Sequence, residues 1–159
     1  MRAGATMGQR ARRGDDVADG HKDYSGTPLW RKLGIRAGSR VVTIDAPASF
    51  RGSLEAIAPI PPRVRFLVRT TKDLDVAVLF VTDRVELERR FGGLADALRS
   101  DGRLWVAWPK KAAKLRTDLT FDVVQRHGLD RGLVDNKSAS IDDVFQGCQF
   151  VYRSSDRPA

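Results

Sequence analysis

The sequence has few of the residues that build disulfides and zinc sites. Its 159 residues include one cysteine and two histidines. Cys148 cannot form a disulfide within the chain, and His21 and His127 lack the spacing to it that is typical of structural zinc sites. No histidine or basic motif that would activate the thiol is adjacent to Cys148 in sequence, so we expect a buried structural thiol and no metal site.

Long apolar runs are also missing. The longest is Val76–Val81, whereas a membrane-spanning helix needs ~20 apolar residues. Near the N-terminus, Arg12 and Arg13 precede Gly14, Asp15 and Asp16, where a signal peptide would have its hydrophobic segment. We therefore expect no membrane partner and a cytoplasmic location.

Acidic residues are fewer than basic ones. The chain has 28 Lys and Arg against 20 Asp and Glu, a net charge of +8, which favours an anionic partner. Residues 1–23 contain almost no large apolar side chain and nearly balanced charges, so we expect a disordered tail there and a single domain over residues 24–159. Aromatic and basic residues do not interleave as in single-strand binders, so nucleic-acid binding through the basic surface remains a less favoured alternative.

Apolar periodicity predicts strands that alternate with helices. A cap-like pair, Asp83 and Glu86, precedes one helix, and Gly92 and Gly93 predict a kink or a break within it. Thr117 is the predicted N-cap of the next helix. The predicted strands are 40–44, 64–68, 75–81 and 104–108, the helices 28–33, 50–58, 83–99 and 118–127, and the closing hairpin strands 133–141 and 148–153. This order predicts an α/β, three-layer, Rossmann-like fold with a mostly parallel sheet of about six strands and a C-terminal antiparallel β-hairpin.

Several short motifs resemble a bacterial domain family of unknown function with a shortened class I methyltransferase-like fold. The resemblance covers residues 24–153 and implies that fold, but no established activity. The motifs are Tyr-Ser-Gly-Thr-Pro-Leu at 24–29, Asp-Ala-Pro at 45–47, Leu-Phe-Val-Thr at 79–82, Trp-Val-Ala-Trp-Pro-Lys-Lys at 105–111, Thr-Asp-Leu-Thr at 117–120 and Gly-Leu-Val-Asp-Asn-Lys at 132–137.

Two positions depart from what the methyltransferase resemblance implies. Active enzymes of that fold have a glycine-rich turn after the first strand and an acidic residue at the end of the second. This chain has Asp45, Ala46 and Pro47 at the first position and Arg69 at the second. Alanine and proline side chains fill space that a cofactor would approach, and arginine cannot accept hydrogen bonds from a ribose.

We therefore expect a domain that binds an anionic small molecule or nucleotide without the usual cofactor turn. The alternative is a divergent S-adenosylmethionine-dependent methyltransferase in which Asp45 makes the ribose or methionine contact. The sequence does not identify the cofactor or any catalytic residue.

The candidate ligand site lies at the carboxyl ends of the predicted strands. Lysines and helix N-termini there favour an anion, Trp108 could offer a stacking face, and the segment 108–111 is expected to face 45–47 across a cleft. The same residue types are also typical of caps, core and solvated surface. His127 is expected to be stabilised by the dipole at a helix C-terminus. The candidate ligand-binding residues are Asp45, Pro47, Thr82, Asp83, Trp108, Lys110, Lys111, Thr117 and Asp118.

Overall fold

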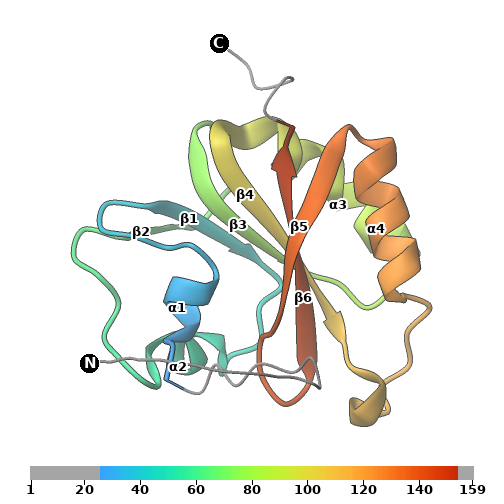
Figure 1. Cartoon of the computed structure of the whole chain (residues 1–159), viewed down its shortest axis with the longest axis horizontal. Helices are drawn as coiled ribbons and strands as arrows, with labels where there is room; N and C mark the ends of the chain where they lie inside the picture. The colour runs from blue at the N-terminus through green and yellow to red at the C-terminus, as the bar shows by residue number, and fades with distance from the viewer. Residues whose placement is uncertain (1–25, 154–159) are drawn as a thin grey trace, which may run out of the picture.

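The computed structural model describes residues 26–153, and a six-stranded sheet forms its centre (Figure 1). The strand order is β2-β1-β3-β4-β6-β5. The expected tail, residues 1–23, lies outside the described residues. The strands are β1 Arg40–Ile44, β2 Arg65–Leu67, β3 Leu74–Phe80, β4 Leu98–Pro109, β5 Leu133–Ser140 and β6 Phe145–Tyr152.

The sheet is mixed rather than mostly parallel. β1 pairs in parallel with β2 and with β3, and β3 pairs in parallel with β4. The closing hairpin adds two antiparallel pairings, β4 with β6 and β6 with β5. The α/β, Rossmann-like architecture and the closing hairpin are confirmed. β3 is buried along nearly its whole length, as its unbroken apolar run predicts for a strand covered on both faces.

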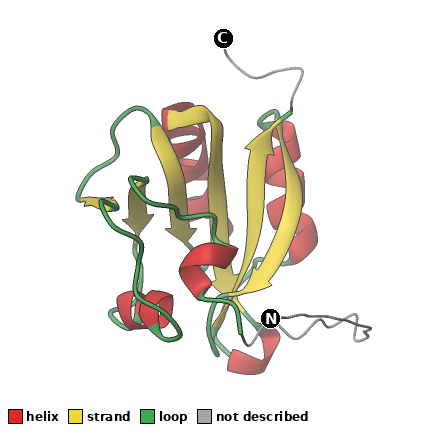
Figure 2. Ribbon diagram, turned by 60° about the vertical axis from the view of Figure 1, so that its left-hand side comes forward, coloured by secondary structure: helices red, strands yellow, loops and turns green. Residues whose placement is uncertain are grey.

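Helices cover both faces of the sheet and give three layers. Two short helices, α1 (Leu29–Lys32) and α2 (Phe50–Glu55), pack on one face around the fully buried Trp105. Two longer helices, α3 (Arg84–Ala97) and α4 (Phe121–Asp130), pack on the other face around Phe91 and Phe150. Figure 2 shows α3 and α4 behind the sheet, with α1 in front of it. None of the helices among residues 26–153 has the length and apolarity of a membrane span.

The ends of α3 and α4 show which sequence signals were reliable. Asp83 caps α3 as predicted, and its side chain accepts a hydrogen bond from the backbone N–H of Glu86. The predicted break at Gly92 and Gly93 is wrong, because α3 continues through both to Ala97. Gly92 is buried under the side chain of Arg131, so tertiary packing compensates for its poor helix propensity.

Threonine capping of α4 occurs one turn later than expected. The N-cap is Thr120, whose side chain accepts a hydrogen bond from the backbone N–H of Val123. The prediction of Thr117 as N-cap is therefore wrong. Thr117 instead binds the loop to the end of β3, as described below.

The single cysteine is a core residue. Cys148 is 1% exposed and lies in β6. Burial raises the pKa of its thiol to about 12, so the neutral thiol is strongly favoured at physiological pH. The expectation of a buried structural thiol is confirmed.

Candidate functional site

The carboxyl ends of β1 and β3 form the switch point of the sheet. The chain leaves β1 to form β2 on one side and then crosses back to form β3 on the other. In open α/β sheets, ligands bind beside the strand ends at such a reversal. The chain after β1 begins with Asp45, and the chain after β3 leads through Thr82 to Asp83. Three of the predicted site residues therefore lie at the switch point.

Asp45 has an unusual backbone conformation for a residue other than glycine. Its φ is +59°, in the left-handed region that costs most L-residues about 1–3 kcal/mol at constrained sites. The residue is exposed. Pro47, two residues later, is partly buried, and its carbonyl oxygen accepts the Phe50 N–H (2.9 Å) where α2 begins. The turn after β1 therefore presents an exposed carboxylate with no hydrogen-bond or ion-pair partner among residues 26–153, on a left-handed backbone that aspartate adopts more readily than most residues.

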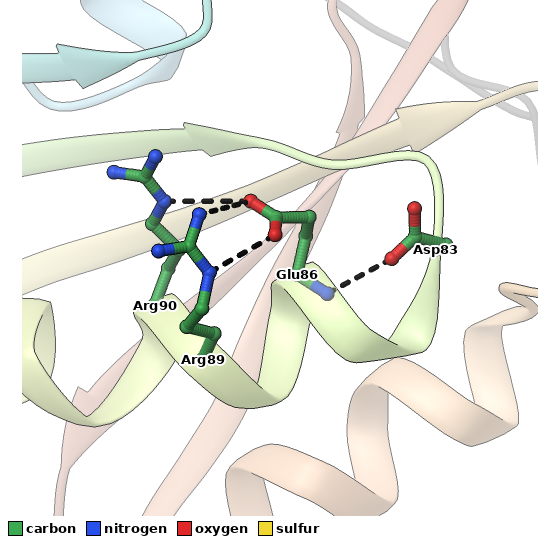
Figure 3. A network of polar contacts seen from close by, with 4 residues as sticks. All are labelled: Asp83, Glu86, Arg89 and Arg90. Carbon is green, nitrogen blue, oxygen red and sulfur yellow. Dashed lines mark hydrogen bonds and ion pairs between the residues drawn. The ribbon is translucent and has the colours of Figure 1, made fainter.

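A charged network on α3 lies near that carboxylate. Arg89 donates from both Nε and one terminal nitrogen to the two carboxylate oxygens of Glu86, each at 3.0 Å. Arg90 Nε lies 3.5 Å from the Glu86 carboxylate, and Figure 3 shows both guanidinium groups converging on it. The hydrogen bonds from Arg89 lower the pKa of Glu86. The pairing with Glu86, with a smaller attraction from Asp45, raises the pKa of Arg89.

Sequence reasoning missed this network. The spacing Glu86, Arg89 and Arg90 is typical of ion pairs along one helix face, and that signal alone does not show that the face approaches Asp45. The proximity arises because α3 starts directly after β3, the strand next to β1.

Four of the predicted residues, Thr82, Asp83, Thr117 and Asp118, take part in structural hydrogen bonds around the start of α3. The Thr117 hydroxyl donates to the Thr82 carbonyl oxygen at 2.6 Å. The Asp118 carboxylate accepts the Arg84 N–H at 2.9 Å, and Asp83 accepts the Glu86 N–H at 2.9 Å. The bonds of Thr117 and Asp118 fasten the loop before α4 to the start of α3, and the bond of Asp83 caps α3 itself. Two first-turn N–H groups of α3 are therefore already paired, which reduces its capacity to hold an anion.

The remaining predicted residues lie at the end of β4. Trp108 is 3% exposed and packs in the core between the sheet, α3 and α4, so little of its ring surface is open to a stacked ligand. Lys110 donates from Nζ to the Ser140 hydroxyl at 2.7 Å, at the end of β5. Lys111 is exposed in a short 3₁₀ turn, η1 (Lys111–Ala113).

The segments 45–47 and 108–111, which were expected to face each other across one cleft, lie at two separate places. β3 lies between β1 and β4, and two strand spacings separate their backbones by about 9–10 Å. Asp45 lies on the side of α3, whereas the hydrogen bond of Lys110 directs its side chain to the closing hairpin.

The end of β2 has no carboxylate that could bind a ribose. Val68, Arg69 and Thr70 follow the strand, all three are exposed, and Val68 is 97% exposed. The departure noted in the sequence is therefore also a feature of the structure. Asp45 is the carboxylate at the end of β1.

A polar groove lies between the two long helices. Its volume is about 320 Å³. His127 lines it, and burial, together with the nearby charge of Arg131, lowers the pKa of the imidazole. Burial therefore favours the neutral imidazole, and stabilisation of His127 by the helix dipole stays a prediction. The residues that line this groove are Arg84, Leu87, Glu88, Asp122, Val123, Arg126, His127 and Asp130.

Residues 26–153 contain no cluster of His, Cys, Asp or Glu suited to a metal ion.

Comparisons with known proteins identify the fold. No family model and no curated protein matches the sequence. Among solved structures, magnesium protoporphyrin IX methyltransferase (ChlM) from Synechocystis PCC 6803 with bound SAM matches with a TM-score of 0.52 and 11% identity, over 79% of this chain and 74% of that chain. The PH0226 protein from Pyrococcus horikoshii OT3 matches with a TM-score of 0.53 and 10% identity, over 79% and 86%. Similarity at this level of identity establishes the architecture, and the chain therefore has a class I methyltransferase-like fold.

Proposed function

We propose that this domain is a divergent S-adenosylmethionine-dependent methyltransferase that binds its cofactor at the switch point beside Asp45. The single observation that carries the proposal is the exposed Asp45 carboxylate in a left-handed conformation directly after β1. Strained residues of this kind cluster at ligand sites. The similar ChlM structures contain SAM or SAH, which supports this class of ligand for the same fold.

The residues at the switch point fit the cofactor in a modified form. A carboxylate can accept hydrogen bonds from ribose hydroxyls or from the methionine ammonium group. Because the end of β2 lacks an acid, Asp45 takes that role. The left-handed turn retains the backbone shape that a glycine would favour.

The nearby Glu86 network gives the site its charge pattern. Arg89 is paired with Glu86 and is also weakly attracted by Asp45, so a positive charge accompanies the Asp45 carboxylate beside the β1 turn. The bound cofactor supplies an activated methyl group, and the protein orients it towards a nucleophile.

The acceptor in this proposal is anionic. Lys110, Lys111, Lys114 and Arg116 lie in the segment that follows β4, at the same edge of the sheet as Asp45. Lys114 has a φ of +56°, so the segment bends sharply after η1. A binding site lined by these cationic side chains would also suit a nucleotide as the methyl acceptor.

Thermal unfolding with ligand tests the cofactor proposal. A ligand at 100 times its Kd stabilises a protein by about 2.7 kcal/mol, so SAM and SAH should both raise the Tm of the full chain. Asp45→Asn should remove half or more of that rise. Asp73→Asn is the matched control. Asp73 is also exposed and left-handed (φ +63°), but it precedes β3 and so lies at the amino end of that strand, away from the switch point. An unchanged Tm with millimolar SAM and SAH would contradict the proposal.

The second candidate function is binding of an anionic small molecule or nucleotide without methyl transfer. The observation that favours it is the basic segment after β4, which does not depend on Asp45. Calorimetry with nucleotides and acidic metabolites, comparing the wild type with Lys110→Ala/Lys111→Ala, tests it. Binding that the double variant loses, without a response to SAM, would favour this function over the first. The cytoplasmic location stays a prediction from the sequence.

A further inference from the structure

Basic side chains gather on the α1 side of the closing hairpin, away from the switch point. We define this basic face by Arg36, Arg103 and Lys137. Arg103 lies in the first half of β4, Lys137 in β5, and Arg36 follows α1. In Figure 2, α4 lies behind the hairpin and α3 behind the neighbouring parallel strands, and α1 stands in front of the sheet beside the hairpin.

A buried glutamine holds Arg103 in place. Gln149 is 4% exposed and its carbonyl oxygen lies 3.4 Å from a terminal nitrogen of Arg103. The amide nitrogen of Gln149 donates to Asn136 at 2.8 Å. On its other side, Arg103 packs against Gly34, where any side chain would collide with the guanidinium. The guanidinium is therefore positioned by neutral groups rather than by an acid.

Lys137 is positioned in a similar way. Its Nζ donates to the Lys32 carbonyl oxygen at the end of α1, at 2.8 Å. The residue is opposite Gln149 in the β5–β6 register. β6 separates β5 from β4, and Arg103 is two residues along β4 from Trp105, which is in register with Gln149. The backbones of Lys137 and Arg103 are therefore about 12 Å apart.

Within the part of the chain that the structure describes, these cations lie together without a carboxylate paired to them. Burial lowers the pKa of Arg103, and the charge of Arg36 lowers it further, against a weaker opposing effect of Asp101. Burial and then the charges of Arg103 and Lys32 lower the pKa of Lys137. Among residues 26–153, no carboxylate is within ion-pair distance of Arg36, Arg103 or Lys137. A bound polyanion would relieve this repulsion.

We propose that the basic face binds the phosphodiester backbone of a nucleic acid without sequence specificity. Cations spread across the width of three strands match successive phosphates along a chain better than they match one small anion. Such binding rests on release of counterions by phosphate contacts, and fixed arginine and lysine side chains provide those contacts. The proposal does not depend on the cofactor site, because the two sites use different residues.

Fluorescence anisotropy of the full chain with a labelled single-stranded RNA, and with a duplex DNA of equal length, tests the proposal. Affinity is measured from 50 to 200 mM salt. Each lost phosphate contact should reduce the slope of log Kobs against log salt by ~0.7 for a single strand. Arg103→Gln/Lys137→Gln should therefore reduce the slope by ~1.4, and Arg36→Gln by ~0.7.

Matched controls separate this site from general basicity and from misfolding. Arg65→Gln/Arg69→Gln removes two exposed charges near β2, at the opposite edge of the sheet, and should leave the slope unchanged. Arg36 is exposed, so its variant keeps the test valid even if the Arg103 variant is poorly folded. Absence of binding at 50 mM salt, or an equal loss in the control, would overturn the proposal. Asp45→Asn should not alter the slope.

Discussion

Replacing Gly128 by alanine should destabilise the domain, although alanine is the better helix former. Gly128 is buried in α4, and an added Cβ would overlap the ring of Phe150. That ring is fully buried in β6 and packs edge-on against Phe91, with ring centroids 5.4 Å apart. Alanine gains about 1 kcal/mol of helix propensity. Overpacking of a filled core typically costs about 1–3 kcal/mol, and because three atoms of the Phe150 ring would overlap the added Cβ, we take the upper part of that range, about 2–3 kcal/mol. We expect a net loss of about 1–2 kcal/mol.

Gly92→Ala is the control for this prediction. An added Cβ there meets the end of the Arg131 side chain, which is exposed and can move away. The helix-propensity gain of up to about 1 kcal/mol should therefore remain. Urea unfolding followed by tryptophan fluorescence gives both free energies of unfolding. The packing argument is refuted if Gly128→Ala is as stable as the wild type, or if Gly92→Ala loses more stability than Gly128→Ala.

Three further predictions concern titration, reactivity and strain. The pKa of His127 is lowered in the folded state, so the unfolded chain binds its proton first as the pH drops. The free energy of unfolding should therefore fall below about pH 6.5. Urea unfolding between pH 7.5 and 5.5 should show a smaller fall for His127→Gln than for the wild type. The Cys148 thiol, with a pKa of about 12, should resist a thiol reagent at pH 8 and react on unfolding, and rapid labelling of the native protein would be the contrary result. Asp45→Gly should keep or raise the Tm by relieving the left-handed strain and lose SAH binding, whereas a large fall in Tm would argue that Asp45 is structural.

The sequence was most informative where one local signal determines an element. The apolar run of β3, the Asp83 cap and the closing hairpin follow from patterns within a few residues, and all three are present. The predicted break at Gly92 and the cap at Thr117 failed because distant residues decide them. Arg131 fills the space beside Gly92, and Thr117 is used by the Thr82 carbonyl.

The candidate site was predictable only as a set of strand ends. Strand order places Asp45 beside the start of α3, and it also puts β3 between Asp45 and Lys110. No local pattern gives that order, so the expected cleft joined residues that the sheet separates. The basic face has the same origin, since Arg36, Arg103 and Lys137 are far apart in sequence and meet through α1 and the hairpin.

Calorimetric titration of the full chain with S-adenosylhomocysteine tests the central claim most directly. We predict binding of one ligand per chain. A hydrogen bond to a charged group contributes about 1.5–3 kcal/mol, so Asp45→Asn should raise the Kd roughly 10- to 100-fold, and Asp73→Asn should leave it unchanged. Absence of binding to the wild type at millimolar ligand, or equal binding by Asp45→Asn, would contradict the account.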